Sequence, residues 1–172
     1  MLSEKDKSSC CCFTGHRPEK LISKEKDIKK IESEIKKLLR PIISQSILDG
    51  YTTYITGMAR GFDMWAADII IEEKIKNPKI RLICALPIND FEKRWSADEQ
   101  KHYHNILNIF DYITVVSKKY SRSCFQLRNI FMVDHSSKVI AAYNGEAGGT
   151  KNTICYAKKH NIEVINILKK EE

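Results

Sequence analysis

A glycine-bearing turn late in the chain is placed to bind an anion. Gly148, Gly149 and Thr150 directly precede a segment with helical periodicity. A helix N-terminus presents unpaired backbone N–H groups and the positive end of the helix dipole, and both favour a phosphate. We interpret the turn, from Asn144 and Gly145 onward, as a phosphate cradle that glycine keeps free of side chains. The alternative is a plain strand-to-helix turn with Thr150 as its N-cap.

This turn lacks the fingerprints of the common nucleotide-hydrolysing and dinucleotide-binding enzymes. A Walker A loop counted from Gly145 would need glycine where Thr150 stands. It would also need Ser or Thr after Lys151, where the chain has Asn152. The GxGxxG spacing of dehydrogenases is missing as well. The sequence therefore argues against ATP hydrolysis and NAD-linked hydride transfer, and we expect no cofactor.

The turn at residues 14–18 combines a hydroxyl group, a glycine and two possible cations. Thr14, Gly15, His16 and Arg17 follow a short apolar run. Hydroxyl and cationic groups of this kind suit a phosphate or a ribose. A histidine on a turn is more often solvent-exposed or hydrogen-bonding than catalytic, so we assign His16 to binding.

Residues 57–63 form a second turn with glycines and charged side chains, at the end of another apolar run. Gly57 and Gly61 flank Arg60, and Asp63 stands at the start of a helical segment. The Asp63 carboxylate could accept hydrogen bonds from the two hydroxyls of a ribose. A carboxylate at a helix start is equally well explained by the helix dipole, which stabilises it without any ligand. The residues leave both interpretations open.

Other side chains give weaker signals. Trp95, in a long polar connection, could stack on a base or pack as a lid on the rim of the sheet, and the sequence favours neither. Arg128 and Asp134 flank an apolar helical segment, which favours an ordinary ion pair between them. His102 and His104 stand two residues apart on a predicted helix and face different ways, so we expect no metal site there.

The elements that must position these residues follow from an alternation of apolar runs with helical periodicity. A first helix is expected after an N-cap at Ser23, with Pro41 kinking or dividing it near its end. Further helices are predicted over residues 63–76, 99–110, 124–133 and 150–159. Strands are predicted over residues 10–14, 52–56, 80–86, 112–116, 138–143 and 162–168.

The alternation predicts an α/β fold. Each predicted strand is a nearly continuous apolar run, which is typical of a parallel sheet covered on both faces. We therefore expect a Rossmann-like, doubly wound, mainly parallel six-stranded sheet with helices on both faces. A single domain would span residues 10–172 after a flexible leader at 1–9. Ligands of such sheets bind at the carboxyl ends of the strands, which is where the turns after the first, second and fifth strands lie.

Composition narrows the class of protein. The 172 residues include 29 Lys and Arg against 22 Asp and Glu, which gives a net charge of +7. This excess is mild and spread along the chain. It is compatible with a phosphorylated small molecule as partner. Nucleic acid is the less favoured partner, because no basic strip interleaved with aromatic residues is present.

The cysteines and the N-terminus predict a reducing compartment. The six cysteines show neither CxxC pairs nor the spacing of a zinc site, so we expect packed, reduced thiols and no metal. The run from Cys10 to Cys12 could be redox-active, although neighbouring strand residues point to opposite faces. The polar N-terminus lacks the apolar core of a secretory signal, and no apolar run is long enough to span a membrane. A cytoplasmic location is expected.

Five motifs together resemble the SLOG superfamily, and within it the YoqJ/YpsA-like branch of bacterial and phage proteins. The resemblance covers nearly the whole chain from about residue 10, with the segments in the expected order. The motifs are CFTGHRP at 12–18, ITGMARGFDMWAADI at 55–69, LPINDFEKRW at 86–95, FQLRNIFMVDHS at 125–136 and YNGEAGGT at 143–150.

The resemblance implies a Rossmann-like domain that binds nucleotides or nucleotide-derived ligands. Members of the superfamily range from phosphoribohydrolases to DNA-processing proteins and sensors of nucleotide messengers. By matching, the glycine-rich turn after the second strand and its acid fall on Gly57, Gly61 and Asp63. The late phosphate turn falls on Gly148, Gly149 and Thr150. In the phosphoribohydrolases that turn reads GGxGTxxE with a catalytic Glu, and Thr153 stands at that position here.

Two functional hypotheses follow. The first is a non-catalytic protein that binds a nucleotide or a nucleotide-derived small molecule as a sensor, regulator or sequestering protein. The second is an N-glycosidase acting on a nucleoside phosphate, which needs a carboxylate to stabilise an oxocarbenium-like transition state. Asp63 is the candidate for that carboxylate. The sequence favours the first hypothesis and leaves open whether the chain forms a homo-oligomer.

Overall fold

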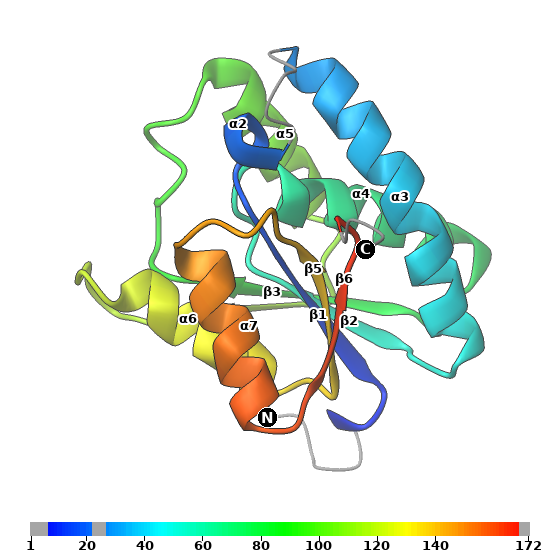
Figure 1. Cartoon of the computed structure of the whole chain (residues 1–172). Helices are drawn as coiled ribbons and strands as arrows, with labels where there is room; N and C mark the ends of the chain where they lie inside the picture. Colours follow the sequence, from blue (N-terminus) through cyan, green and yellow to red (C-terminus); the bar gives the residue numbers. More distant parts are fainter. Residues whose placement is uncertain (1–6, 22–26, 169–172) are drawn as a thin grey trace.

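A parallel sheet in the order β4-β3-β2-β1-β5-β6 organises the molecule (Figure 1). The computed structural model describes residues 7–21 and 27–168. Within them the strands are β1 (Cys10–Gly15), β2 (Thr53–Thr56), β3 (Arg81–Leu86), β4 (Tyr112–Val115), β5 (Lys138–Ala142) and β6 (Glu163–Asn166). The helices are α2 (Pro18–Leu21), α3 (Ile28–Leu48), α4 (Phe62–Lys76), α5 (Ala97–Leu107), α6 (Cys124–Asp134) and α7 (Gly149–Lys159).

The chain reverses its direction of winding between β1 and β5. From β1 it moves outward to β4, and it then returns to the other side of β1. In the parallel register Cys11 lies beside Tyr54 of β2, and Phe13 lies beside Ile140 of β5. The predicted Rossmann-like, doubly wound parallel sheet is therefore confirmed. The switch point, where such folds bind ligands, lies at the carboxyl ends of β1 and β5.

Two layers of helices cover the sheet. Figure 1 shows α3, α4 and α5 on one side, and α6 and α7 on the other. Alternate residues of β1 enter different cores, because successive strand side chains point to opposite faces. Cys11 and Phe13 pack in the core beneath α3, α4 and α5, whereas Cys12 packs with Met132 and Val133 of α6.

Helix α3 differs from its prediction at its start and at its proline. Its N-cap is Asp27, whose side chain accepts a hydrogen bond from the Lys29 backbone N–H at 3.0 Å. Ser23, the predicted N-cap, lies outside the described residues. Pro41 does not divide the helix. It is exposed, and the helix is held on both sides of it by one buried stripe, which consists of Ile31, Ile35, Leu39 and Ile43.

Helix α5 begins two residues earlier and ends three residues earlier than predicted. Ser96 caps it: its hydroxyl accepts a hydrogen bond from the Glu99 backbone N–H, and the Glu99 carboxylate accepts one from the Ser96 N–H. This capping box is encoded by Ser-Ala-Asp-Glu and was readable from the sequence. The four-residue helix α2 was not predicted.

The cysteines are packed thiols, with one exception. Cys10, Cys11, Cys12, Cys84 and Cys124 are buried, whereas Cys155 on α7 is exposed, contrary to expectation. Burial raises the pKa of both Cys12 and Cys84 to about 12, so these thiols stay protonated and unreactive. No helix in the described part of the chain is long and apolar enough to cross a membrane.

The aromatic contact at the centre of the first core gives a stability prediction. Phe13 is fully buried, stacks on Tyr54 with ring centroids 6.0 Å apart, and meets Phe62 edge-on at 6.3 Å. We expect Phe13→Ala to lower the free energy of unfolding by about 3–5 kcal/mol in urea titrations, because it leaves a cavity between β1, β2 and α4. The control Leu48→Ala, at a side chain that is 80% exposed, should change it by less than about 0.5 kcal/mol. Equal losses in the two variants would contradict this role of Phe13.

Candidate functional site

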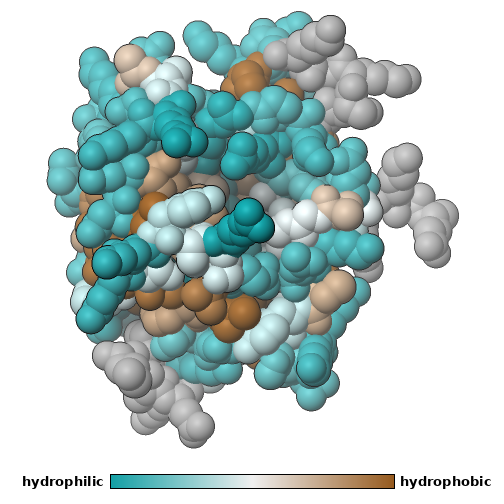
Figure 2. Space-filling view, turned by 90° about the vertical axis from the view of Figure 1, so that its left-hand side faces the viewer, coloured by the Kyte–Doolittle hydropathy of each residue, from teal (hydrophilic) through white to brown (hydrophobic). Residues whose placement is uncertain are grey.

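A cleft of about 1040 Å³ opens at the carboxyl ends of the strands, beside the switch point. Figure 2 views this end of the molecule and shows a hollow among mostly hydrophilic residues. Ten residues that the sequence singled out line the cleft: Thr14, Gly15, His16, Arg17, Arg60, Asp63, Trp95, Gly148, Gly149 and Thr150. The remaining four, which are Gly57, Gly61, Asn144 and Gly145, do not line it.

Three of these four residues shape the turns that border the cleft. Gly61 is the N-cap of α4 with a φ of 88°, and a Cβ there would press on the Pro18 ring. Asn144 donates from its side chain to the Lys20 carbonyl oxygen at 2.6 Å and so fixes α2 against the turn after β5. Gly145 gives that turn its left-handed φ of 100°.

The turn before α7 has the geometry of an anion site. Gly148 is the N-cap, at a φ of 151° that side chains rarely adopt, and no side chain caps the helix. The alternative interpretation required Thr150 to be the N-cap, and that part of it is wrong. It is buried as the second residue of the helix. The first backbone N–H groups of α7 are left without a side-chain acceptor at the edge of the cleft, where they could donate to a phosphate.

His16 is buried rather than exposed, and one of its ring nitrogens has no partner. The residue is 6% exposed, its backbone N–H donates to the Ala142 carbonyl oxygen at 3.1 Å, and its ring lies 5.4 Å from the Tyr143 ring. Its Nε2 atom is buried without a hydrogen bond. Burial, and then the charge of Lys20, lower the pKa of His16, which favours the neutral ring. An unpartnered buried nitrogen at a cleft wall is a group that a bound ligand can satisfy.

A buried ion pair forms the floor of the cleft. Asp63, in the first turn of α4, and Arg128, in α6, are each 4% exposed. The Asp63 Oδ2 atom lies 4.0 Å from Arg128 Nη1 and accepts a hydrogen bond from the Ala59 N–H at 3.3 Å. Burial raises the pKa of Asp63 to about 6, although Arg128 and the backbone N–H groups of Ala59 and Gly57 oppose this rise. Asp63 thus lies in the first turn of α4 and also lines the cleft.

The sequence prediction for Arg128 was wrong. Arg128 does not pair with Asp134, whose carboxylate accepts a hydrogen bond from the Tyr156 hydroxyl at 2.9 Å. The Arg128 guanidinium instead donates to the Gly57 carbonyl oxygen and to the Asn129 side chain. A Cβ on Gly57 would overlap this guanidinium, which explains why residue 57 is glycine.

The cations around the cleft divide into paired and unpaired groups. Arg60 joins Glu19 of α2 to Glu99 of α5, and Lys20 pairs with Glu146 at 3.0 Å. Lys93 pairs with Asp90 at 2.9 Å. Arg17 and Arg94 line the cleft and have no ion-pair partner among the described residues. These two exposed guanidinium groups are available to an anionic ligand.

One wall of the cleft is aromatic. Trp95 meets Phe91 edge-on at 5.3 Å and Tyr103 at 5.6 Å, and Phe91 meets Phe125 at 6.3 Å. Trp95 is half-buried, so it packs on the rim and still lines the cleft. Tyr120, which is 70% exposed, lies at the same cleft.

Sequence reasoning missed several residues of this site. Arg128, Asn129, Arg94, Phe91 and Phe125 line the cleft and were not selected. The only signal for Arg128 was a cation within an apolar helical segment, and no spacing rule connects it with Gly57. Among the described residues, no cluster of three or more His, Cys, Asp or Glu side chains could hold a metal ion.

Comparison with known proteins agrees with this architecture. The model of the YspA SLOG family matches residues 11–168. An uncharacterized SPbeta prophage-derived protein, YoqJ of Bacillus subtilis (strain 168), is 36% identical over 118 residues, covering 62% of this chain and 69% of YoqJ. A UPF0398 protein of Bacillus thuringiensis (strain Al Hakam) is 30% identical over 155 residues, covering 89% of this chain and 84% of that protein.

A solved structure shares the fold. The X-ray structure of DNA processing protein A from Streptococcus pneumoniae superposes with a TM-score of 0.60 at 15% sequence identity. The match covers 92% of this chain but only 50% of that one, so the chain spans about half of the neighbour's length. Because the family model covers nearly the whole chain, this protein belongs to the YspA SLOG family.

Proposed function

We propose that the cleft binds a nucleotide or a nucleotide-derived small molecule without turning it over. The observation that carries the proposal is the meeting of an uncapped helix N-terminus with an unpartnered, buried histidine nitrogen at one switch-point cleft. Both groups lack a partner within the described chain. A ligand with phosphate and polar ring or sugar groups would supply partners to both.

The phosphate end of the ligand is assigned to the start of α7. Gly148 and Gly149 leave the backbone open there, and a Cβ on Gly149 would meet only the Asn129 side chain, at 3.8 Å. Arg17 lines the same cleft as an unpaired guanidinium, which suits the planar, multidentate binding of phosphate oxygens. The positive end of the α7 dipole adds to this attraction.

The base end is assigned to the aromatic wall. Trp95, Phe125 and Tyr120 offer ring surfaces at the cleft, and a flat heterocycle gains free energy by stacking on such rings. The cleft volume of about 1040 Å³ exceeds what a single phosphate needs and is ample for a nucleotide.

Two side chains favour a binding role over catalysis, because one is not an acid and the other already has partners. Thr153 takes the position of the catalytic Glu of the phosphoribohydrolases, and its hydroxyl donates to the Gly149 carbonyl oxygen at 2.8 Å. Asp63 is held by Arg128 and the Ala59 N–H. One observation favours the N-glycosidase as second candidate, because a carboxyl with a pKa of about 6 in a cleft is suited to proton transfer.

We expect Gly149→Asp to abolish nucleotide binding without unfolding the protein. The site has room for the side chain, but the added negative charge repels the phosphate. The measurement is the melting temperature in the presence of mono-, di- and cyclic nucleotides, ADP-ribose and a short single-stranded oligonucleotide. A bound ligand at a concentration of about 100 Kd raises the free energy of unfolding by about 2.7 kcal/mol. Asn152→Asp adds the same charge at an exposed position on α7 and should still bind. Unchanged affinity in Gly149→Asp would contradict the phosphate assignment, and a shift with the oligonucleotide alone would indicate a nucleic-acid partner.

A second experiment separates binding from turnover. We expect the small molecule that stabilises the protein to be recovered intact by chromatography after incubation with it. Release of free base would contradict the binding proposal and support the N-glycosidase. In that case Asp63→Asn should abolish base release while keeping the thermal shift, and equal release by the variant would exclude Asp63 as the catalyst.

The raised pKa of Asp63 predicts a pH dependence of stability. Between its ordinary value of 3.8 and about 6, folded Asp63 holds a proton that the unfolded chain has lost, so Asp63 contributes less stability as the pH rises. This shift corresponds to up to about 3 kcal/mol lost across the window. Because Asp63→Asn cannot titrate, its melting temperature should fall less steeply than that of the wild type between pH 4 and about 6. Parallel profiles in calorimetry would show that Asp63 titrates normally.

A further inference from the structure

The Asn166 side chain extends the sheet by one residue where β5 and β6 end. Strand β5 ends at Ala142 and β6 at Asn166. The Tyr143 backbone N–H, just beyond β5, donates to Asn166 Oδ1 at 2.9 Å, and Asn166 Nδ2 donates to the Tyr143 carbonyl oxygen at 2.9 Å. Oδ1 also accepts a hydrogen bond from the Leu168 N–H at 3.3 Å. One side-chain amide thus binds both backbone polar groups of Tyr143, as a neighbouring strand would.

Tyr143, held in this way, packs on His16. On the other side of β5, the His16 backbone N–H donates to the Ala142 carbonyl oxygen at 3.1 Å, so His16 and Tyr143 follow the ends of two neighbouring strands. Their ring centroids lie 5.4 Å apart, with the planes tilted by 33°. His16 lines the cleft, whereas Tyr143 and Asn166 do not. Asn166, on an edge strand, is therefore connected through Tyr143 to a ring in the cleft wall.

The polar neighbours of the His16 ring are too exposed to shield it from water. Lys20, Asn144 and Glu146 are all exposed. They bind one another, since Lys20 pairs with Glu146 at 3.0 Å and the Glu146 N–H donates to the Asn144 side chain at 3.0 Å. Burial is nevertheless the largest cause of the lowered pKa of His16, followed by the charge of Lys20. The half-buried Tyr143 ring supplies apolar cover that these side chains do not.

We propose that Asn166 is a positioning residue of the cleft: by fixing Tyr143 against His16, it holds the buried, unpartnered Nε2 atom of His16 in place for a ligand. The inference rests on the proposed function, because the position of Nε2 affects binding only if a ligand bonds to it. A group that is already fixed binds more tightly, since less conformational freedom is lost when the ligand enters. Asn166 thereby contributes to affinity without touching the ligand.

The first test is the pKa of His16, measured in the full chain by NMR titration of the imidazole signals. The His16→Gln variant identifies which signals belong to His16. Asn166→Leu keeps the approximate size of the side chain and removes the amide. It should loosen Tyr143, admit water to the His16 ring and raise the pKa of His16 toward its ordinary value of 6.5. The control Asn105→Leu makes the same substitution at an exposed position of α5 and should leave the pKa of His16 as in the wild type.

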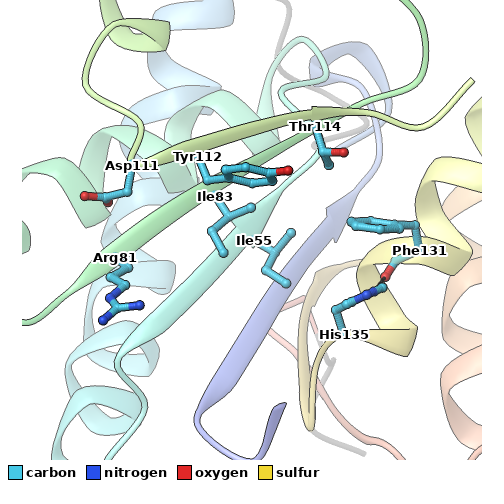
Figure 3. A pocket seen from close by; sticks show the side chains of 8 residues that line it. All are labelled: Ile55, Arg81, Ile83, Asp111, Tyr112, Thr114, Phe131 and His135. Atoms are coloured by element: carbon cyan, nitrogen blue, oxygen red, sulfur yellow. Dashed lines mark hydrogen bonds between the residues drawn. The ribbon is translucent and has the colours of Figure 1, made fainter. Parts of the chain in front are cut away.

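Two other histidines report whether a variant is altered only near the cleft. His102 of α5 contacts Asp68 at 3.1 Å, and this hydrogen bond is the main cause of its raised pKa. His135 lines a separate pocket of about 800 Å³ beside β3 and β4, with its ring 4.1 Å from that of Phe131 (Figure 3). These two strands lie farthest from β6 in the sheet. The pKa of His102 and the signals of His135 should be the same in Asn166→Leu and the wild type.

The second test is affinity for the mono-, di- and cyclic nucleotides and ADP-ribose. For the compound that stabilises the wild type, we expect the Kd of Asn166→Leu to rise about tenfold, which corresponds to the loss of about one hydrogen bond. The Kd of Asn105→Leu should not change. If none of these compounds binds the wild type, the proposed function fails and so does the ligand role of Asn166. The pKa comparison then still decides whether Asn166 positions His16.

The outcomes are distinct. A raised pKa of His16 together with weaker binding in Asn166→Leu, with the control unchanged, supports the proposal. An unchanged pKa of His16 in the folded variant overturns it, and so does a raised pKa with unchanged affinity. Equal changes at His102 or His135 show a general disturbance of the fold and also overturn it. If circular dichroism shows that Asn166→Leu does not fold, Asn166→Ala, which adds no bulk, carries the same test.

Discussion

The buried guanidinium of Arg128 is the contact on which the arrangement of the cleft depends. It reaches from α6, which covers one face of the sheet, to Asp63 and Gly57, which belong to the other half of the chain. Removing one member of a buried ion pair typically costs 3–5 kcal/mol, because the remaining charge is left without a partner. The pair therefore fixes how the two halves of the fold meet at the carboxyl edge. It also explains two sequence features at once, the glycine at 57 and the acid at 63.

The position of the cleft follows from the winding of the chain. Because the connections after β1 and β5 diverge to opposite faces of the sheet, the space between their ends is left open. The turns that border this space carry His16 and the start of α7, and the loop before α5 supplies the aromatic wall. The groups that we propose for phosphate and base thus come from segments far apart in sequence. Topology alone brings them together.

The sequence predicted the parts of the molecule that local patterns encode. Continuous apolar runs identified each strand to within two residues at either end, and glycine turns after the strands located nine of the 22 residues that line the cleft. The missed features depend on tertiary contacts. Arg128 was assigned to Asp134 because spacing rules consider only residues on one helix, and the burial of His16 depends on Tyr143, which is distant in sequence. Pro41 was expected to interrupt α3, but packing of the stripe on both sides of it prevails over its local effect.

The distribution of thiols makes the protein convenient for spectroscopy. Five cysteines are buried, and Cys155 alone is exposed. A maleimide dye would therefore attach at one place in the native chain without any engineering. That place is on α7, the helix whose first turn borders the cleft. Fluorescence from this position would report on the environment of the helix in real time. The buried thiols would react with the dye only in unfolded molecules, so labelling beyond one dye per chain would measure the unfolded fraction.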